Sequence, residues 1–206
     1  MTPFYVMLRL LLLLFVSMWL AGCGGPDNPP LAADAVVLAF GDSLTEGVGA
    51  GGERQAYPAQ LQRLTGRRVV NGGVSGEETS QGRERLVALL DEVQPELLIL
   101  LQGGNDILRS RPVSQIRDNL AAMIEAAQAR GISVLLVGVP QKSLFSDSAP
   151  LYAELAQQYG VLFEEELVAD LLRTPSLKSD PIHLNAEGYR RLAEGIRERL
   201  HDSGLL

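Results

Sequence analysis

With 206 residues, of which 46% are hydrophobic and 21% charged, the chain is long enough to bury a sizeable core in one domain. Its formal net charge at pH 7 is −7, and no run of lysines and arginines provides the basic surface that nucleic-acid phosphates require. Length and composition therefore indicate one globular domain and argue against a nucleic-acid-binding protein.

Residues 1–22 have the pattern of an export signal and are set apart from the fold. Leu10 to Leu20 form an apolar run that only Ser17 interrupts, and Arg9 is the only charged residue before it. Such a run is about half of the ~20 residues that span a bilayer, and small residues follow it at once, as they do at a signal cleavage site. We therefore expect cleavage; a single membrane anchor is the alternative.

Residues 20–23 read Leu-Ala-Gly-Cys, which resembles the lipobox of bacterial lipoproteins. The resemblance implies that Cys23 becomes the lipidated first residue of the mature protein, whereas the alternative is an ordinary signal peptide followed by a chance cysteine. Cys23 is the only cysteine, so no internal disulfide can form, and acylation would consume its thiol. Several acyl chains on one residue would hold the protein to a membrane leaflet.

The residues after the signal are expected to be a flexible tether, residues 23–35, ahead of a domain that covers residues 36–206. Residues 24–33 include three prolines and two glycines, a composition typical of linkers. No aspartate directly follows Cys23, so the inner-membrane retention signal known for some lipoproteins is missing. We expect a monomeric envelope lipoprotein that faces the periplasm, with a mild preference for the outer membrane.

From Val36 onward, short apolar runs alternate with amphipathic segments. The runs are nearly continuous in hydrophobicity, as strands of a sheet covered on both faces are. Strand–helix alternation at this spacing predicts an α/β fold with a parallel sheet and helices on both faces. The predicted buried strands are Val36–Phe40, Arg68–Asn71, Leu97–Leu101, Ser133–Val137 and Val161–Phe163.

Amphipathic segments between and after the strands predict helices. Within residues 80–93, for example, leucine and valine recur at spacings of three and four, which places them on one helix face. Ser114 and Asn185 are expected N-caps, and Gly131 is expected to follow a helix C-terminus. The predicted helices are Tyr57–Leu64, Ser80–Val93, Ser114–Ala129, Leu151–Tyr159 and Ala186–His201.

Four polar or glycine-rich blocks stand directly after predicted strands or ahead of the last predicted helix. Residues 41–47 read Gly-Asp-Ser-Leu-Thr-Glu-Gly, residues 71–79 Asn-Gly-Gly-Val-Ser-Gly-Glu-Glu-Thr, residues 103–106 Gly-Gly-Asn-Asp, and residues 180–185 Asp-Pro-Ile-His-Leu-Asn. In open α/β sheets, ligands bind beyond the carboxyl ends of the strands. The placement of the blocks therefore predicts one active site at this edge of the sheet.

Ser43, in the first block, is the candidate nucleophile. Gly41 lets the chain turn sharply after a buried strand, so the hydroxyl can project near the partial positive charge of a helix N-terminus. A serine hydroxyl needs an adjacent base to remove its proton. The chain has two histidines, and His201 is expected to sit solvated in the last turns of the terminal helix, which leaves His183 as the candidate base.

Asp180 precedes His183 by three residues, so in a turn its carboxylate can reach Nδ1 and leave Nε2 free for the serine. Taken alone, the same spacing fits a turn capped by Asp180 with a polar loop histidine, but the other blocks favour a triad. Attack on an acyl carbon also creates an oxyanion. The candidate donors to it are the backbone N–H groups of Ser43 and Gly76 and the side-chain amide of Asn105.

Together the four blocks resemble the Ser, Gly, Asn and His blocks of the SGNH, or GDSL, hydrolase family, over residues 36 to about 200. The pattern is most similar to the bacterial periplasmic thioesterase/lysophospholipase/arylesterase group. The resemblance implies a flavodoxin-like three-layer α/β/α sandwich with a five-stranded parallel sheet. It also implies that Ser43 is the nucleophile, that Gly76 and Asn105 complete the oxyanion hole, and that Asp180 and His183 complete the triad.

Pro181 departs from the family pattern, in which many members have glycine after the triad aspartate, and we expect it to stiffen the turn harmlessly.

Two other kinds of active site are excluded because the chain lacks residues that they require. The α/β-hydrolase elbow requires Gly-x-Ser-x-Gly, but Thr45 occupies the final glycine position. Zinc requires three or four ligands, and with His201 remote and Cys23 acylated no such set remains. No metal or organic cofactor is therefore expected.

The expected function is hydrolysis of acyl esters or thioesters, lipid-derived, outside the cytoplasm. Ile107 and Leu108, in the expected loop after the third block, and the connection Pro140–Pro150 are predicted to line the acyl pocket because they are apolar and lie at the carboxyl edge. Asp42 and Asp106 are assigned to loop hydrogen bonding. The alternatives are a carbohydrate or peptidoglycan O-acetylesterase and a non-catalytic envelope lipoprotein that keeps the fold.

Overall fold

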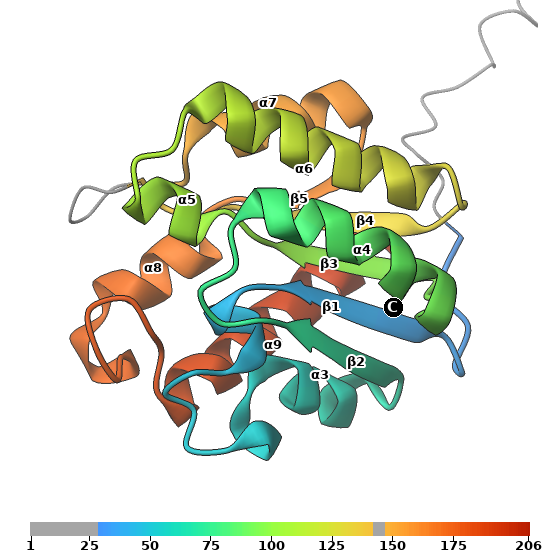
Figure 1. Cartoon of the computed structure of the whole chain (residues 1–206). Helices are drawn as coiled ribbons and strands as arrows, with labels where there is room; N and C mark the ends of the chain where they lie inside the picture. The colour runs from blue at the N-terminus through green and yellow to red at the C-terminus, as the bar shows by residue number, and fades with distance from the viewer. Residues whose placement is uncertain (1–28, 142–146) are drawn as a thin grey trace, which may run out of the picture.

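A five-stranded parallel sheet in the order β2-β1-β3-β4-β5 forms the centre of the computed structural model, which describes residues 29–141 and 147–206 (Figure 1). Its strands pair in parallel throughout. They are β1 (Val36–Gly41), β2 (Arg68–Gly73), β3 (Leu97–Leu101), β4 (Ser133–Val137) and β5 (Leu162–Glu164).

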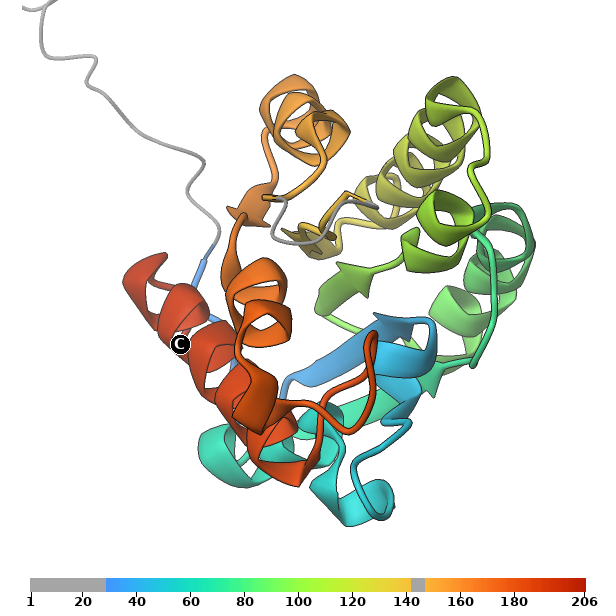
Figure 2. The same cartoon turned by 90° about the vertical axis from the view of Figure 1, so that its left-hand side faces the viewer.

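Helices cover both faces of this sheet (Figures 1 and 2). α4 (Thr79–Val93), α6 (Val113–Gln128) and α7 (Pro150–Tyr159) lie on one face, and α3 (Tyr57–Thr65) and α9 (Ala186–Asp202) lie on the other. Short elements stand in the connections: α2 (Ser43–Glu46), α5 (Gly104–Leu108), α8 (Leu167–Arg173) and the 3₁₀ turns Glu53–Gln55 and Pro175–Leu177. The predicted three-layer α/β/α sandwich is confirmed.

The central strands of the sheet, rather than all five, are buried. Every residue of β3 is buried, and β1 and β4 are buried apart from their first residues. β2 and β5 are mostly half-buried or exposed, so the prediction of buried strands is wrong for these two. The physical reason is position, because an edge strand has a neighbouring strand on one side only. β2 also runs two residues beyond its predicted end, and β5 begins one residue later than predicted.

Two of the three expected helix-end residues are where the sequence placed them. Asn185 caps α9, with its side chain accepting the N–H of Gly188 at 3.0 Å. Gly131 follows α6 with a left-handed φ of 71°. Ser114 is not an N-cap, because α6 begins one residue earlier and Pro112 stands at the cap position. The fixed φ of proline suits a helix start, and its missing N–H leaves no donor to satisfy there.

The folded domain begins before the predicted boundary at Val36. Leu31 is buried and its N–H donates to the carbonyl of Leu205 at 2.9 Å, while Arg67 donates to the carbonyls of Leu31 and Ala32. The expected tether from Leu31 onward is therefore part of the domain.

The export signal and Cys23 lie outside the described residues. Within those residues, no helix combines the length and apolar character needed to cross a bilayer.

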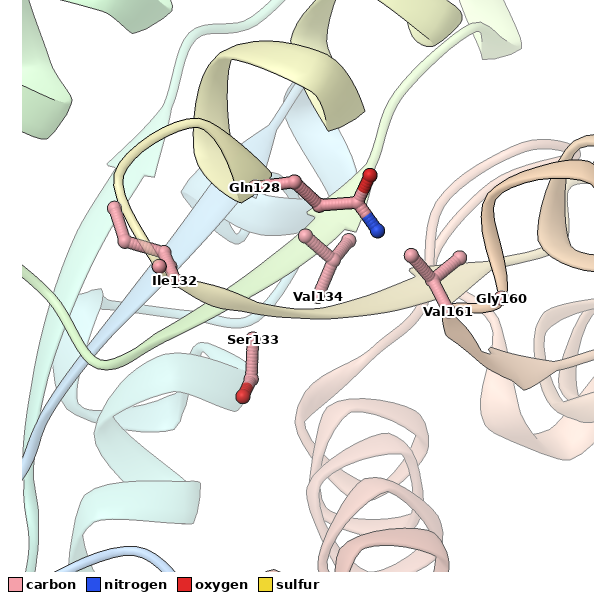
Figure 3. A pocket seen from close by; sticks show the side chains of 7 residues that line it. Gln128, Ile132, Ser133, Val134, Gly160 and Val161 are labelled. Carbon is pink, nitrogen blue, oxygen red and sulfur yellow. The ribbon is translucent and has the colours of Figure 1, made fainter. Parts of the chain in front are cut away.

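A cavity of about 260 Å³ lies at the amino-terminal edge of the sheet, where β4 and β5 begin (Figure 3). Parallel strands all end at the opposite edge, where the first three sequence blocks follow β1, β2 and β3. The cavity is therefore separate from the predicted site. It is lined by Gln128, Gly131, Ile132, Ser133, Val134, Gly160 and Val161.

Candidate active site

The site lies where the direction of winding reverses in the sheet. β1 has β2 on one side and β3 on the other, and the chain reaches β2 through α3 on one face but reaches β3 through α4 on the opposite face. At such a switch point, the loops that leave adjacent strands diverge and open a crevice at the carboxyl edge. The first three sequence blocks follow the strands that border this point.

Ser43 is the first residue of α2, which follows β1 after Asp42 alone. A Cβ at Gly41 would lie 2.0 Å from the carbonyl oxygen of Leu101, so only glycine lets the chain leave β1 this close to β3. Asp42 caps α2, with Oδ1 accepting the N–H of Leu44 at 3.1 Å. The N–H of Ser43 donates to no acceptor among the described residues, as is usual in the first turn of a helix.

Ser43, His183 and Asp180 form one hydrogen-bonded chain. Oγ of Ser43 lies 3.0 Å from Nε2 of His183, and Nδ1 of His183 lies 2.7 Å from Oδ2 of Asp180. The side chain of His183 is 15% exposed and that of Asp180 is 43% exposed. Because a carboxylate only accepts, Nδ1 carries the proton on its side of the ring, and Nε2 is left to accept the proton of the serine hydroxyl.

Backbone groups of its own turn hold the carboxylate of Asp180. Its Oδ1 accepts the N–H groups of Ile182 at 2.9 Å and His183 at 2.8 Å. Pro181 has no N–H, so it leaves no donor unpaired in this turn. Partial burial alone would raise the pKa of Asp180, but hydrogen bonds from the His183 ring and from the two backbone N–H groups lower the pKa below its usual range. The carboxylate is therefore ionised at neutral pH.

Hydrogen bonds fix the loop that carries His183, one within the loop and one between the helix that follows it and the segment after α2. The N–H of Ser179 donates to the carbonyl of His183 at 3.0 Å, which closes the loop on itself. Asn185 begins α9, and the hydroxyl of Tyr189 on that helix donates to the carbonyl of Val48, just after α2, at 2.7 Å. These contacts fix the position of the imidazole relative to the helix that begins with the serine.

Gly76 lies in a tight turn after β2. The N–H of Glu77 donates to the carbonyl of Val74 at 3.2 Å, and Gly76 has a φ of 76°. These features define a type II turn over residues 74–77, whose third position requires a positive φ. The N–H of Gly76 has no acceptor in the described part of the chain. The turn is joined to the first block because the N–H of Val74 donates to the carbonyl of Gly41 at 3.0 Å.

Asn105 is the second residue of α5, directly after the turn at the end of β3. The turn needs Gly103, which has a φ of 114° and would place a Cβ 2.4 Å from the hydroxyl of Tyr152. Nδ2 of Asn105 donates to the carbonyl of Glu77 at 3.1 Å and lies 3.4 Å from Oδ2 of Asp42. The amide of Asn105 thus lies between the serine block and the Gly76 turn.

Asp42 and Asp106 hold the blocks together through hydrogen bonds, as predicted. Asp42 is 5% exposed, and burial raises its pKa to about 6. Asp106 accepts the N–H of Thr79 at 2.8 Å and its hydroxyl at 2.6 Å, which joins α5 to α4. In the described part of the chain, no group of three or more histidine, cysteine, aspartate or glutamate side chains is arranged to hold a metal ion.

The ion pair of Arg85 with the buried Glu77 was not predicted from the sequence. Glu77 is 6% exposed, and both of its carboxylate oxygens accept from Arg85 at 2.8 Å. The guanidinium also lies 4.2 Å from the ring centroid of Phe40 and donates to the carbonyl of Gly72 at 2.9 Å. The pair fixes the end of the Gly76 turn against β1 and β2. No local pattern marks a spacing of eight residues between the two charges.

Exposed apolar side chains stand beside the catalytic candidates. Ile107 and Leu108 lie on helix α5 rather than in the loop that the sequence predicted, with Ile107 packed against the core and Leu108 41% exposed. Val74 in the Gly76 turn and Ile182 in the His183 loop are also 41% exposed, and neither was predicted from the sequence to line the site. Much of the Pro140–Pro150 connection lies outside the described residues.

Comparisons with known sequences agree with this arrangement. The chain matches the GDSL-like Lipase/Acylhydrolase family over residues 39–191, which include all four blocks. It is 38% identical over 144 residues to Esterase TesA of Pseudomonas aeruginosa, covering 67% of this chain and 70% of that protein. It is 30% identical over 190 residues to Thioesterase 1/protease 1/lysophospholipase L1 of Escherichia coli K12, covering 84% of this chain and 88% of the relative.

Solved structures share the fold. A crystal structure of TesA superposes with a TM-score of 0.74 at 30% identity, covering 83% of this chain and 99% of that one. The SGNH-hydrolase family esterase AlinE4 superposes with a TM-score of 0.63 at 31% identity, covering 84% and 98% of the two chains. Since the family match spans most of the chain and the fold is shared, the chain belongs to the GDSL-like lipase/acylhydrolase family and is a hydrolase that acts on esters.

Proposed function

We propose that this esterase cleaves acyl esters or thioesters through an acyl-enzyme on Ser43, with His183 as general base and Asp180 as the residue that orients it. The observation that carries the proposal is the hydrogen-bonded chain that runs from the serine hydroxyl through both imidazole nitrogens to the carboxylate, with separations of 3.0 Å and 2.7 Å. Both separations are within the range that proton transfer and ring orientation require.

In the first half of the reaction, Oγ of Ser43 attacks the acyl carbon while its proton passes to Nε2 of His183. The carboxylate of Asp180 stabilises the imidazolium that forms. When the tetrahedral intermediate collapses, the imidazolium gives its proton to the leaving alcohol or thiol. In the second half, a water molecule attacks the acyl-enzyme with His183 again as base, and the carboxylic acid is released.

Three donors are proposed to bind the oxyanion of both tetrahedral intermediates: the N–H of Ser43, the N–H of Gly76 and the amide of Asn105. The two backbone N–H groups have no acceptor among the described residues, so both are available. Nδ2 of Asn105 has two hydrogens: one donates to the carbonyl of Glu77, and the other has the longer contact of 3.4 Å with Oδ2 of Asp42, which a bound oxyanion would replace. Donors fixed in advance stabilise developing charge without reorganisation, which is often the largest catalytic contribution.

We propose a lipid-derived acyl group as the preferred substrate, because Val74, Leu108 and Ile182 present apolar side chains from three of the site's loops and helices. Each buried methylene contributes about 0.8 kcal/mol, so a chain that covers even part of this surface gains at least roughly tenfold in kcat/KM. We therefore expect p-nitrophenyl octanoate to be hydrolysed with a higher kcat/KM than the acetate, and the octanoyl thioester to be cleaved as well.

A matched pair of variants tests whether the exposed apolar side chains of the site cause the preference for octanoate. Leu108→Ala should reduce the advantage of octanoate over acetate, whereas Val87→Ala should not, although Val87 is equally exposed, at 43%, in the middle of α4. A preference for acetate over octanoate in the unaltered enzyme would contradict the lipid-directed proposal and favour an O-acetylesterase. Absence of all hydrolysis would favour a binding protein that keeps the fold.

The proposed location is the cell envelope, with export through residues 1–22 and attachment to a membrane through lipidated Cys23. The support is the sequence pattern, which ends an apolar run with Leu-Ala-Gly-Cys. Mass spectrometry of protein extracted from membranes is expected to find an acylated N-terminal peptide that begins at Cys23. A mature protein with a different first residue, or with an unmodified thiol at Cys23, would contradict the proposal.

A further inference from the structure

The Gly76 turn has contacts on one side with α2 and on the other with α5. On the α2 side, the N–H of Ser75 donates to the carboxylate of Glu46. On the α5 side, two side chains bind two successive carbonyls of the turn: Arg109 Nη1 lies 3.1 Å from the carbonyl of Gly76, and Nδ2 of Asn105 lies 3.1 Å from that of Glu77. The turn therefore lies between the helix of the nucleophile and the helix of the third oxyanion donor.

Asn105 is the second residue of α5, and Arg109, four residues later, is the C-cap of this helix, so the two residues are one helical turn apart on the same side. This spacing lets one helix face bind consecutive peptide groups of the turn. Two groups are proposed to bind the oxyanion beside Ser43. The N–H of Gly76 belongs to the turn and the amide of Asn105 belongs to α5, and Arg109 connects the turn with the end of α5. The distance between these donors consequently depends on how firmly the turn is held to α5.

Glu78 holds the guanidinium of Arg109 in place. Nη1 of Arg109 lies 2.9 Å from Oε1 of Glu78, whose side chain is 12% exposed. Arg111 binds the same carboxylate through two donors at 3.0 Å. Among the described residues, Arg111 makes no hydrogen bond to a carbonyl of the Gly76 turn. The two arginines are almost equally exposed, at 47% and 48%. They therefore share a partner, a charge and an environment, and differ in the contact with Gly76.

We propose that Arg109 is a positioning residue that holds the Gly76 turn at a fixed distance from Asn105, so that both donors reach the same oxyanion. The proposal rests on the function proposed above. Catalytic groups lose efficiency when they are displaced by about 1 Å, with losses on the order of 100-fold. The internal hydrogen bond of the turn, from the N–H of Glu77 to the carbonyl of Val74, leaves out the carbonyl of Gly76, which accepts from Arg109. Because glycine has broad conformational freedom, this contact restrains the backbone at Gly76.

The test compares Arg109→Met, which keeps the aliphatic stem but removes the donor, with Arg111→Gln as the matched control. We expect Arg109→Met to lower kcat by about 10-fold to 100-fold with KM within about twofold, because the contact acts on the transition state. Arg111→Gln is expected to keep kcat within about twofold, since an exposed ion pair contributes little. Arg109→Lys, which can still donate to the carbonyl, is expected to recover part of the loss.

An alkylboronic acid provides a readout that a merely structural role would not change. Oγ of Ser43 adds to the trigonal boron while the hydroxyl proton passes to His183, and the tetrahedral boronate places an oxygen among the oxyanion donors. Its Ki is expected to rise by about as much as kcat/KM falls in Arg109→Met and to stay unchanged in Arg111→Gln. Thermal midpoints of both variants should stay within about 4 °C of the unaltered protein.

Three results would overturn the proposal: equal losses of kcat in Arg109→Met and Arg111→Gln, no loss in Arg109→Met, or a loss confined to KM with an unchanged boronic acid Ki. If Arg109→Met does not fold, Arg109→Lys carries the comparison, and full activity in Arg111→Gln with reduced kcat in Arg109→Lys supports the proposal. Failure of the proposed function is distinguishable, because the unaltered enzyme would then be no faster than Ser43→Ala.

Discussion

Replacing His183 with alanine is expected to lower kcat/KM for an acyl ester by about 10⁴-fold to 10⁶-fold, and Ser43→Ala is expected to lower it by a similar factor. These factors correspond to roughly 5.5–8 kcal/mol of transition-state stabilisation. The reason is that the two residues act as one unit: without Nε2 at 3.0 Å the hydroxyl keeps its proton, and without Oγ the base has nothing to activate. The measurement is steady-state hydrolysis of p-nitrophenyl octanoate.

His201→Ala is the matched control, because His201 is the only other histidine of the chain and its side chain is 77% exposed near the end of α9. It should hydrolyse the ester at the rate of the unaltered enzyme. The double variant Ser43→Ala with His183→Ala should be hardly slower than either single variant. A loss below about tenfold in His183→Ala would show that another group removes the serine proton.

Replacing Asn105 with alanine is expected to lower kcat by about 10²-fold to 10³-fold, with KM much less affected. This is the effect, roughly 2.7–4 kcal/mol, of removing one donor from an oxyanion hole. Nδ2 of Asn105 lies 3.1 Å from the carbonyl of Glu77 and 3.4 Å from the carboxylate of Asp42. The amide is therefore held between the serine block and the Gly76 turn. Kinetics on the same ester give the result.

Asn105→Asp keeps the shape of the side chain but replaces the amide donor with a carboxylate. It should be at least as slow as Asn105→Ala, because a carboxylate repels the oxyanion and can also no longer donate to Glu77. A thermal melt of each variant separates lost chemistry from lost folding. Full activity in Asn105→Asp at neutral pH would show that the amide takes no part in stabilising the intermediate.

Most of the sheet and its helices could be predicted because the signals are local. The run Leu97–Leu101 is apolar throughout and becomes the fully buried central strand β3. Asn185 caps α9 because its side chain competes for a free backbone N–H three residues on, which is a property of the sequence alone. The triad candidates could also be found, because Asp180 and His183 are close in sequence and only two histidines exist.

The features that were missed depend on position in the folded molecule. The sequence of β2 does not reveal that it becomes an edge strand, because strand order is a tertiary property. α5 and α8 are five and seven residues long, too short for propensity to stabilise, and form because they pack in place. The Arg109 contact joins residues 33 positions apart, so no pattern along the chain could indicate it.

The measurement that tests the account most directly is covalent labelling with an alkyl fluorophosphonate, followed by peptide mapping. The serine oxygen displaces fluoride at phosphorus and is phosphonylated only when a base activates it. We predict one adduct per chain, on Ser43, formed rapidly in the unaltered protein and in His201→Ala but at least ~10³-fold more slowly in His183→Ala. An unlabelled protein, or a label on any other residue, would contradict the assignment of Ser43 and His183 as the reacting pair.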